Sequence, residues 1–281
     1  MILVLGSTGT TGGEVARQLI AAGHRPRLLV RDPARAAEFQ GSAEIVRGDL
    51  DDADSLRAAM AGIERVYMVS AGGDLPAQEG RVVDAAREAG VRHVVKLSVM
   101  GADDPQIEFS RWHAKSERHL MDSGLAWTMV RPGNFMTNSL AWADTIRTQG
   151  AFYQPTGEGR WAAIDPADIA AVAVRALTED GHEGQAYAIT GPESLSAAEY
   201  AQRLSAAIGK PVNFVDVPPE AARGAMLESG MPAGYVDALL DLLAAMKAGH
   251  MDGVANGVEQ VTGRPARTFD DWARRNAAAF Q

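Results

Sequence analysis

Short apolar runs of strand length alternate with helix-patterned segments along the first half of the chain. The runs occur at residues 2–5, 26–30, 43–46, 65–69, 93–97 and 127–130. Segments with apolar residues at helical spacing, such as residues 14–22, lie between most of them. This alternation is typical of a parallel sheet with helices on both faces, so we predict a doubly wound α/β fold.

The pattern becomes less regular after about residue 150, where glycine and proline separate shorter runs. We expect helices at residues 167–177 and 197–208, late strands at 185–189 and 212–215, and a closing helix at 269–280 that begins near Thr268. We therefore predict a larger domain over residues 1–150 and a smaller α/β lobe over residues 151–281 packed on it. The boundary is approximate, and some crossing of the chain is expected.

The carboxyl ends of the predicted strands should share one crevice, because crossovers between parallel strands are right-handed. The loops at these ends carry Gly6, Arg31, Asp49, Ser70, Ser98 and Arg131. Ligands of open α/β sheets bind at this edge, so we expect the binding site there.

Glycines at three-residue spacing follow the first predicted strand and precede the first helix. Gly6, Gly9 and Gly12 stand where a tight turn, a bare backbone and a close helix contact are needed to hold a dinucleotide diphosphate. A glycine-rich turn that binds nothing is the alternative. The residues expected to hold the cofactor here are Gly6, Ser7, Thr8, Gly9, Thr10, Thr11 and Gly12.

Arg31 takes the first position after the second predicted strand. A guanidinium there can grip the 2′-phosphate of NADP(H), whereas a carboxylate would bind the ribose diol of NAD(H). NADP(H) is therefore preferred. NAD(H) stays open because Asp32 is adjacent, and Arg31 could also be an ordinary solvated charge.

Two further loops are expected to touch the cofactor. Asp49 and Leu50 end the third strand where the adenine ring would lie, and the next aspartates are better suited to capping a helix. The small residues after the fourth strand would let the backbone approach the ribose on the nicotinamide side, although a flexible turn would account for them equally. These residues are Ser70, Ala71 and Gly72.

Composition excludes several classes of protein. Of 281 residues, 46% are hydrophobic and 22% charged, as in a globular enzyme, and the formal charge of −9 disfavours nucleic-acid binding. Cysteine is absent, which excludes disulfides and thiolate metal sites, and no metal site is apparent from the histidines. No apolar stretch approaches membrane-spanning length, and the first strand starts at residue 1, so we expect a cytoplasmic protein, monomer or homodimer, without a signal peptide.

Several motifs occur in an order that is more specific than any one of them. They are Gly6-x-x-Gly9-x-x-Gly12, Val30-Arg31-Asp32-Pro33, Gly48-Asp49-Leu50, Lys96-x-Ser98, the segment around His113, Lys115 and Glu117, and Arg131-Pro-Gly-Asn-Phe135. With residues 163–169 and Phe269-x-x-Trp272, the chain resembles the NmrA-like atypical short-chain dehydrogenase/reductases over essentially its full length.

The resemblance implies a Rossmann-type nucleotide domain, NADPH or NADH at the glycine loop, and a smaller lobe over the nicotinamide. The family includes quinone reductases, dye reductases, benzylic ether reductases and non-catalytic nucleotide sensors, so the fold does not choose among these activities.

The usual short-chain reductase has a tyrosine four residues before a lysine, and the phenol donates a proton. Here Lys115 is present, but Arg111 takes the tyrosine position. Reduction of a simple ketone gives an alkoxide whose conjugate acid has a pKa of about 16, so it needs an acid. A quinone gives a phenolate with a pKa near ~10, which resonance stabilises. The missing tyrosine therefore favours a quinone, a conjugated enone, or a cationic dye or iminium.

Three residues are candidates for the chemistry. Lys115 could orient the ribose or stabilise a developing anion, or it could be an exposed helical lysine. His113 could donate a proton, but two residues that are two positions apart on a helix do not share a face, so it is not expected to act with Lys115. Ser98 could hydrogen-bond a carbonyl or the cofactor, or cap a turn.

The segment after the sixth strand is expected to pass beside the nicotinamide, where Asn134 could donate a hydrogen bond to a carbonyl group. It contributes Pro132, Asn134 and Phe135 to the expected cofactor site. Flat, apolar acceptors suit an aromatic pocket. Its expected wall is Phe135, Met136, Phe152, Tyr153 and Trp161, for each of which ordinary core packing is the alternative.

The sequence thus predicts an NADPH-dependent reductase that transfers hydride to a quinone-like or other small, hydrophobic, conjugated molecule. A regulatory protein that senses NAD(P)(H) without catalysis is the first alternative. A biosynthetic tailoring reductase or isomerase is the second.

Overall fold

The computed structural model describes residues 1–281 and groups them into two compact units. The first unit comprises residues 1–105, 110–132 and 166–188, and the second comprises residues 106–109, 133–165 and 189–281. The units are interleaved in sequence, so no single boundary near residue 150 separates them. The reason is that residues 166–188 return to the first unit and complete its sheet.

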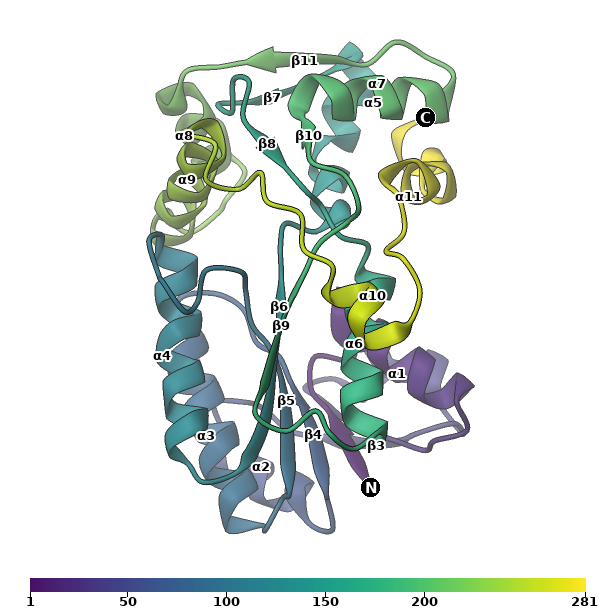
Figure 1. The fold of residues 1–281 in the computed structure, drawn as a ribbon, viewed down its shortest axis with the longest axis vertical. Helices are drawn as coiled ribbons and strands as arrows, with labels where there is room; N and C mark the ends of the chain where they lie inside the picture. The colour runs from purple at the N-terminus through teal and green to yellow at the C-terminus, as the bar shows by residue number, and fades with distance from the viewer. The chain divides into compact units, whose positions relative to one another are not determined.

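The first unit contains a seven-stranded parallel sheet with the order β3-β2-β1-β4-β5-β6-β9 (Figure 1). Its strands are β1 (Ile2–Val4), β2 (Arg27–Val30), β3 (Glu44–Arg47), β4 (Arg65–Met68), β5 (His93–Leu97), β6 (Ala126–Pro132) and β9 (Gln185–Ile189). Every strand expected in the first half of the sequence is present. The predicted Rossmann-type α/β fold is therefore confirmed.

Helices cover both faces of this sheet. One face carries α2, α3 and α4, and the other carries α1 and α6, which pack on each other. The bounds are α1 (Thr10–Ala21), η1 (Pro33–Phe39), α2 (Ala53–Met60), α3 (Leu75–Glu88), α4 (Glu108–Asp122) and α6 (Pro166–Thr178). Alternate strand residues such as Val66 and Met68 pack beneath α2 and α3, while the strands stay apolar on both faces.

The second unit has two small sheets and an aromatic core. Strands β7 (Ala151–Gln154) and β11 (Asn213–Asp216) pair in parallel, and β8 (Arg160–Trp161) and β10 (Leu195–Ser196) pair antiparallel. Its helices are η2 (Met136–Trp142), α5 (Ala143–Gln149), α7 (Ala197–Ile208), α8 (Pro219–Glu228), α9 (Ala233–Lys247), α10 (Gly257–Thr262), α11 (Phe269–Arg275) and η3 (Ala277–Phe280).

Two helix boundaries differ from the sequence-based expectation. Helix α1 begins at Thr10 rather than near residue 14, directly after the loop glycine Gly9. The closing helix starts after Thr268, whose hydroxyl accepts from the Asp271 amide at 3.1 Å, as expected of an N-cap. It ends at Arg275, and a separate short helix follows because Asn276 leaves the helical conformation.

None of the helices combines the length and the apolar composition required to cross a membrane.

Candidate functional site

The glycine loop is a tight cradle built from backbone. Gly6 has a φ of +61°, which favours glycine. A Cβ on Gly12 would overlap the carbonyl of Gly6 and lie 2.6 Å from the Leu5 carbonyl oxygen, so only glycine lets α1 approach β1 this closely. A Cβ on Gly9 would have a single neighbour, 3.3 Å away, so this glycine borders free space.

The amino end of α1 leaves its hydrogen-bond donors unpaired. Gly9 is the N-cap and offers no side chain, so the first amides of the helix have no intrahelical acceptor. The hydroxyl of Ser7 is also buried without a partner. Unpaired donors at the positive end of a helix dipole could hold an anionic group such as a diphosphate.

Arg31 and Asp32 have different surroundings at the end of β2. The Asp32 carboxylate accepts a hydrogen bond from the Ala34 amide at 3.0 Å and caps η1. This carboxylate therefore already has a structural role. Arg31 is exposed and forms no ion pair, and the same holds for Arg35 in η1. Two free guanidinium groups therefore lie on this loop and helix. Arg35 was not anticipated from the sequence, although Arg-x-x-x-Arg after a strand was a readable signal.

Asp49 and Leu50 lie at the end of β3 in a hydrogen-bonded turn. One carboxylate oxygen of Asp49 accepts from the Asp51 amide at 3.1 Å, and the Leu50 carbonyl accepts from Arg81 at 2.8 Å. Asp52 caps α2 by accepting from two amides, as expected. The second carboxylate oxygen of Asp49 stays available for a ligand donor.

A fully buried ion pair lies near the carboxyl end of β5. The Lys96 ammonium contacts the Glu79 carboxylate of α3 at 2.5 Å, and neither side chain has exposed surface. Ser70, in the loop after β4, donates to Glu79 at 3.2 Å, and Ser116 of α4 donates to it as well. Of the loop's three predicted cofactor contacts, Ala71 is exposed and Gly72 has a φ of +92°.

His113 and Lys115 lie in opposite environments on α4. The His113 Nδ1 atom is 3.2 Å from the Lys96 ammonium. Burial, reinforced by the charge of Lys96, holds the pKa of His113 well below its usual value, so the imidazole is neutral at pH 7. Lys115 is exposed and forms no ion pair. The two side chains are not brought together, in agreement with their spacing on the helix.

Ser98 belongs to a second buried network. Its hydroxyl donates to Glu117 at 2.5 Å, and the same carboxylate accepts two hydrogen bonds from Arg131, at 3.0 and 2.7 Å. Hydrogen bonding to Glu117, helped by the charges of Glu117 and Asp103 and opposed by burial, raises the pKa of Arg131. A serine hydroxyl has one proton. Ser98 therefore has no donor left for a substrate carbonyl in this arrangement.

The residues after β6 that were predicted to contact the cofactor already form some contacts within the protein. Pro132 is buried at the end of the strand. The Asn134 side-chain oxygen accepts from the Phe135 amide at 3.1 Å and from Asn138, which leaves the Asn134 amide group free to donate. Phe135 is half-buried and bridges to Ile164.

The expected aromatic wall is mostly core of the second unit. Trp161 stacks on Tyr200 at 4.9 Å, and Phe152 stacks on Trp142 at 4.0 Å. Met136, Phe152 and Trp161 are at most 2% exposed. Tyr153 is 42% exposed, and its hydroxyl donates to Gln149. Buried faces already covered by neighbours cannot also line a pocket, so this placement supports core packing for Met136, Phe152 and Trp161.

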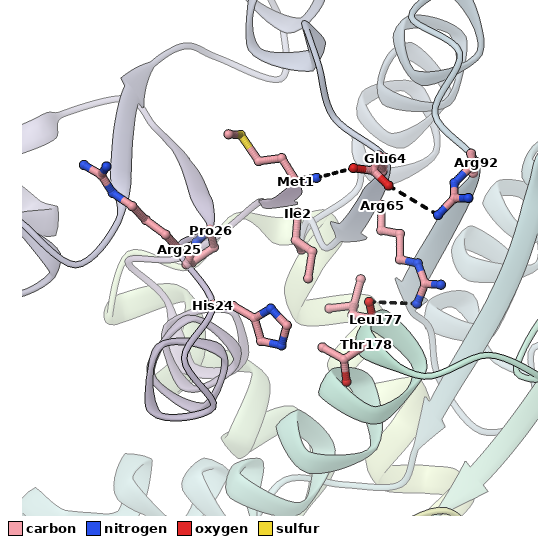
Figure 2. Close-up of a pocket in the computed structure, with 10 residues that line it drawn as sticks. All are labelled: Met1, Ile2, His24, Arg25, Pro26, Glu64, Arg65, Arg92, Leu177 and Thr178. Atoms are coloured by element: carbon pink, nitrogen blue, oxygen red, sulfur yellow. Dashed lines mark hydrogen bonds and ion pairs between the residues drawn. The ribbon is translucent and has the colours of Figure 1, made fainter.

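A hollow of about 330 Å³ lies at the opposite edge of the first unit's sheet (Figure 2). It is bordered by the starts of β1, β4 and β5, and several of its charged groups already have hydrogen-bond partners. Glu64 bonds both the amino group of Met1 and Arg92, while Arg65 donates to the Leu177 carbonyl. Ligands of such sheets bind at the carboxyl ends, so this hollow is not the expected site.

The sequence assigned no role to three side chains that form the buried networks of the first unit. They are Lys96, Glu79 and Glu117. A lysine inside the apolar strand HVVKL was a readable signal, because a buried charge needs a partner. That its partners would be Glu79 and His113 could not be read, since they come from two different helices. The structure contains no group of three or more His, Cys, Asp or Glu side chains that could hold a metal ion.

Residues 6–180, more than half of the chain, match the NAD(P)H-binding family, so the chain belongs to this family. NAD(P)H azoreductase from Xenophilus azovorans is 45% identical over 283 residues, which cover 100% of this chain and 99% of that protein. The structure of NADPH-dependent quinone oxidoreductase from Escherichia coli, complexed with NADPH, has a TM-score of 0.89 at 28% identity and covers 98% of this chain and 99% of its own.

The resemblance to NmrA-like proteins is confirmed as well. NmrA, a negative transcriptional regulator solved in complex with NADP, has a TM-score of 0.79 at 18% identity and covers 97% of this chain and 94% of its own. At that identity the likeness concerns the fold alone.

Proposed function

We propose that this chain is an NADPH-dependent reductase that transfers hydride to a quinone, an azo compound or another conjugated small molecule. The observation that carries the proposal is the end-to-end similarity to NAD(P)H azoreductase. The unpaired Ser7 hydroxyl and the open amino end of α1 support the cofactor half of it.

The residues of the first unit divide the work of holding the cofactor. The α1 amides and Ser7 bind the diphosphate. Arg31 and Arg35 bind the 2′-phosphate, because guanidinium groups form paired hydrogen bonds with phosphate oxygens, and NADPH is therefore used in preference to NADH. When bound, the reduced nicotinamide supplies the hydride.

The proton is the second requirement of the reaction. A conjugated acceptor spreads the negative charge left by hydride addition, which lowers the demand for a strong acid. His113 is the residue we assign to donate a proton to that anion, and its neutral imidazole is kept in place by Lys96. Lys115 stays a candidate for orienting the ribose.

Steady-state assays test the proposal directly. Purified protein is mixed with NADPH and a panel of quinones, azo dyes and enones, and loss of the reduced-nicotinamide absorbance is followed. We expect turnover with some of these acceptors and a lower kcat/KM with NADH. Tight NADPH binding without oxidation across the panel would instead indicate a protein that senses the nucleotide without catalysis.

Two substitutions separate the catalytic candidates. His113→Gln removes the imidazole and should lower kcat, whereas Lys115→Ala tests the lysine expected from the sequence. A fall in kcat/KM for NADPH in Lys115→Ala alone would assign the ribose contact to Lys115. An unchanged Lys115→Ala together with an impaired His113→Gln would assign the chemistry to His113.

The remaining expectations stay predictions: a small hydrophobic substrate, no nucleic-acid partner, a cytoplasmic location and a monomer or homodimer. Size-exclusion chromatography with light scattering tests the oligomeric state.

A further inference from the structure

Lys96 is a buried cation whose hydrogen bonds are all committed. Its ammonium lies 2.5 Å from a Glu79 oxygen, 3.2 Å from His113 Nδ1 and 3.3 Å from the Leu97 carbonyl oxygen. An ammonium carries three N–H donors and no acceptor. Each donor therefore has one partner, and His113 Nδ1 must be an acceptor.

Glu79 anchors this ammonium from the other side. Its carboxylate accepts from Lys96, from Ser116 of α4 and from Ser70 in the loop after β4. These three donors stabilise the ionised carboxylate, and they come from three different elements. Burying such a pair is costly in free energy, so its presence beside a histidine calls for a functional explanation.

The accepting Nδ1 fixes where the proton of His113 resides. A neutral imidazole has one N–H, so the proton is on Nε2. The Nε2 atom has no protein hydrogen-bond partner, and it is absent from the buried unpaired atoms, so it reaches the surface. His113 thus presents an N–H donor outward while its other nitrogen contacts a buried cation.

The chain of contacts starts at a loop that belongs to the proposed site. Ser70 lies after β4, where the nicotinamide-side ribose is expected, and it is linked through Glu79 and Lys96 to His113. The loop and the start of α4 are close, since a Cβ on Gly73 would lie 3.8 Å from the Trp112 ring.

We propose that Lys96 is a positioning residue for the reduction: it holds His113 as the Nε2–H tautomer and replaces the proton that His113 gives to the reduced acceptor. This inference rests on the proposed reductase function. A neutral imidazole that donated alone would become an imidazolate, a strong base. A second proton transfer from Lys96 avoids that state.

The step balances in atoms and charge. The Nε2–H bond breaks as the anionic oxygen or nitrogen of the acceptor takes the proton, and a Lys96 N–H bond breaks as Nδ1 takes its proton. His113 remains neutral, Lys96 becomes an amine, and the negative charge left by hydride transfer is neutralised. A proton from water then returns through Nε2 and Nδ1 to Lys96.

Nitrogen NMR of ¹⁵N-histidine-labelled protein tests the tautomer without any turnover. The His113 signals are assigned by their loss in His113→Gln. We expect an unprotonated Nδ1 and a protonated Nε2 in the wild-type protein at pH 7. A protonated Nδ1 would overturn the proposal whatever the protein reduces.

The absence of cysteine allows a specific chemical rescue. Lys96→Cys removes the ammonium, and alkylation of the new thiol with 2-bromoethylamine restores an amine of nearly the same length; because this side chain is buried, the protein is alkylated in denaturant and then refolded. We expect kcat to fall about 10²-fold in Lys96→Cys, in line with the loss of general acid catalysis, and to recover after alkylation. Lys210→Cys, at an exposed lysine of the second unit, is the matched control and should behave as wild type at both stages.

A folding defect is separated from a chemical one by a second variant. Glu79→Gln/Lys96→Met removes both charges and leaves no unpaired carboxylate, and its fold is checked by circular dichroism and thermal unfolding. A folded double variant should show both His113 tautomers and a slowed proton step, seen as a larger solvent deuterium isotope effect. Wild-type kcat in folded Lys96→Cys or in the double variant would overturn the proposal.

The proposed function and the inference about Lys96 fail in different ways. If the wild-type protein does not oxidise NADPH with any acceptor of the panel, the proposed reductase function is overturned, and with it the proton supply by Lys96. Turnover that is unaffected at Lys96 overturns only the inference about Lys96.

Discussion

His93 is a buried imidazole at the start of β5 with one nitrogen left unpaired. The Thr128 hydroxyl donates to the His182 carbonyl at 2.6 Å, so it must accept from His93 Nε2 at 2.9 Å. The Nδ1 atom is then an acceptor without a partner, and it is buried. Protonating it would place a charge in the sheet. Accordingly, burial lowers the pKa of His93 to about 4, with Arg65 and His182 adding to the effect and Glu183 opposing it.

This pKa predicts how stability depends on pH. The unfolded chain binds a proton at His93 near pH 6.5, whereas the folded chain binds it near pH 4. The stability that neutral His93 contributes is therefore complete above pH 6.5 and is lost as the pH falls from 6.5 toward 4, by roughly 3 kcal/mol. His93→Gln keeps an N–H donor for Thr128 and should flatten this part of the curve. Urea unfolding of both proteins from pH 4 to 8 measures it, and identical slopes would contradict the assignment.

Arg31 predicts the choice between the two nicotinamide cofactors. Arg31→Ala should weaken NADPH binding by tenfold or more while NADH binding changes little, because a charged hydrogen bond is worth about 1.5–3 kcal/mol. Isothermal titration calorimetry with both cofactors measures the effect. Arg25→Ala, at an exposed arginine on the opposite edge of the same sheet, is the control and should change neither affinity. Equal losses for NADPH and NADH would place the adenosine end elsewhere.

The environments of His113 and Lys115 mark the limit of prediction for single residues. Their spacing on a helix was enough to expect that they face different ways. Which of them faces the sheet depends on Lys96, a residue 17 positions away that contacts only one of them. Local pattern identifies such candidates, and the contact across elements separates them.

The elements of the first unit were readable because their signals are local. Buried parallel strands appear as continuous apolar runs, and glycine spacing marks the turn into α1. The start of α1 was misplaced because Thr10 to Gly13 has low helix propensity, which the tight turn at Gly6 overrides. The role of Trp161 was harder still, since an aromatic residue looks the same in a core and on a pocket wall until its neighbour Tyr200 is known.

The loop and helix together predict different effects at two neighbouring glycines. Gly12→Ala would drive a methyl group into the backbone of Gly6 and Leu5, and should lower the free energy of unfolding by about 3 kcal/mol. Gly9→Ala has a negative φ of −106° and a contact of 3.3 Å, so stability should change by under about 1 kcal/mol. Its methyl group would nevertheless stand where the diphosphate approaches, and NADPH affinity should fall.

Thermal unfolding without cofactor and calorimetric titration with NADPH distinguish the two variants. Gly9→Ala should lose affinity while keeping stability, and Gly12→Ala should lose stability first. Unchanged NADPH affinity in a folded Gly9→Ala variant would contradict the cradle assigned to this loop.

At the scale of the whole molecule, the chain leaves the first unit at residue 133 and returns at residue 166. The returning segment supplies α6, which packs on α1, β4, β5 and β6, and whose Ile169 and Val172 have no exposed surface. Gln18 of α1 also donates to the Ala167 carbonyl at 2.9 Å. Sequence composition cannot show this return, because residues 166–188 look like the start of the second half.

The interleaving predicts which fragments fold. A fragment of residues 1–150 lacks α6 and β9, so it exposes one apolar face of the sheet and the edge of β6. Each large aliphatic side chain that loses its cover costs about 1.5–3 kcal/mol, which is a sizeable part of a domain's stability. We expect this fragment to aggregate or to unfold without a cooperative transition. Residues 1–132 joined to residues 166–188 by a flexible linker contain the complete sheet and should unfold cooperatively. Circular dichroism melts of both fragments and of the full chain measure this, and a sharp transition in the 1–150 fragment would show that α6 is dispensable for the core of the first unit.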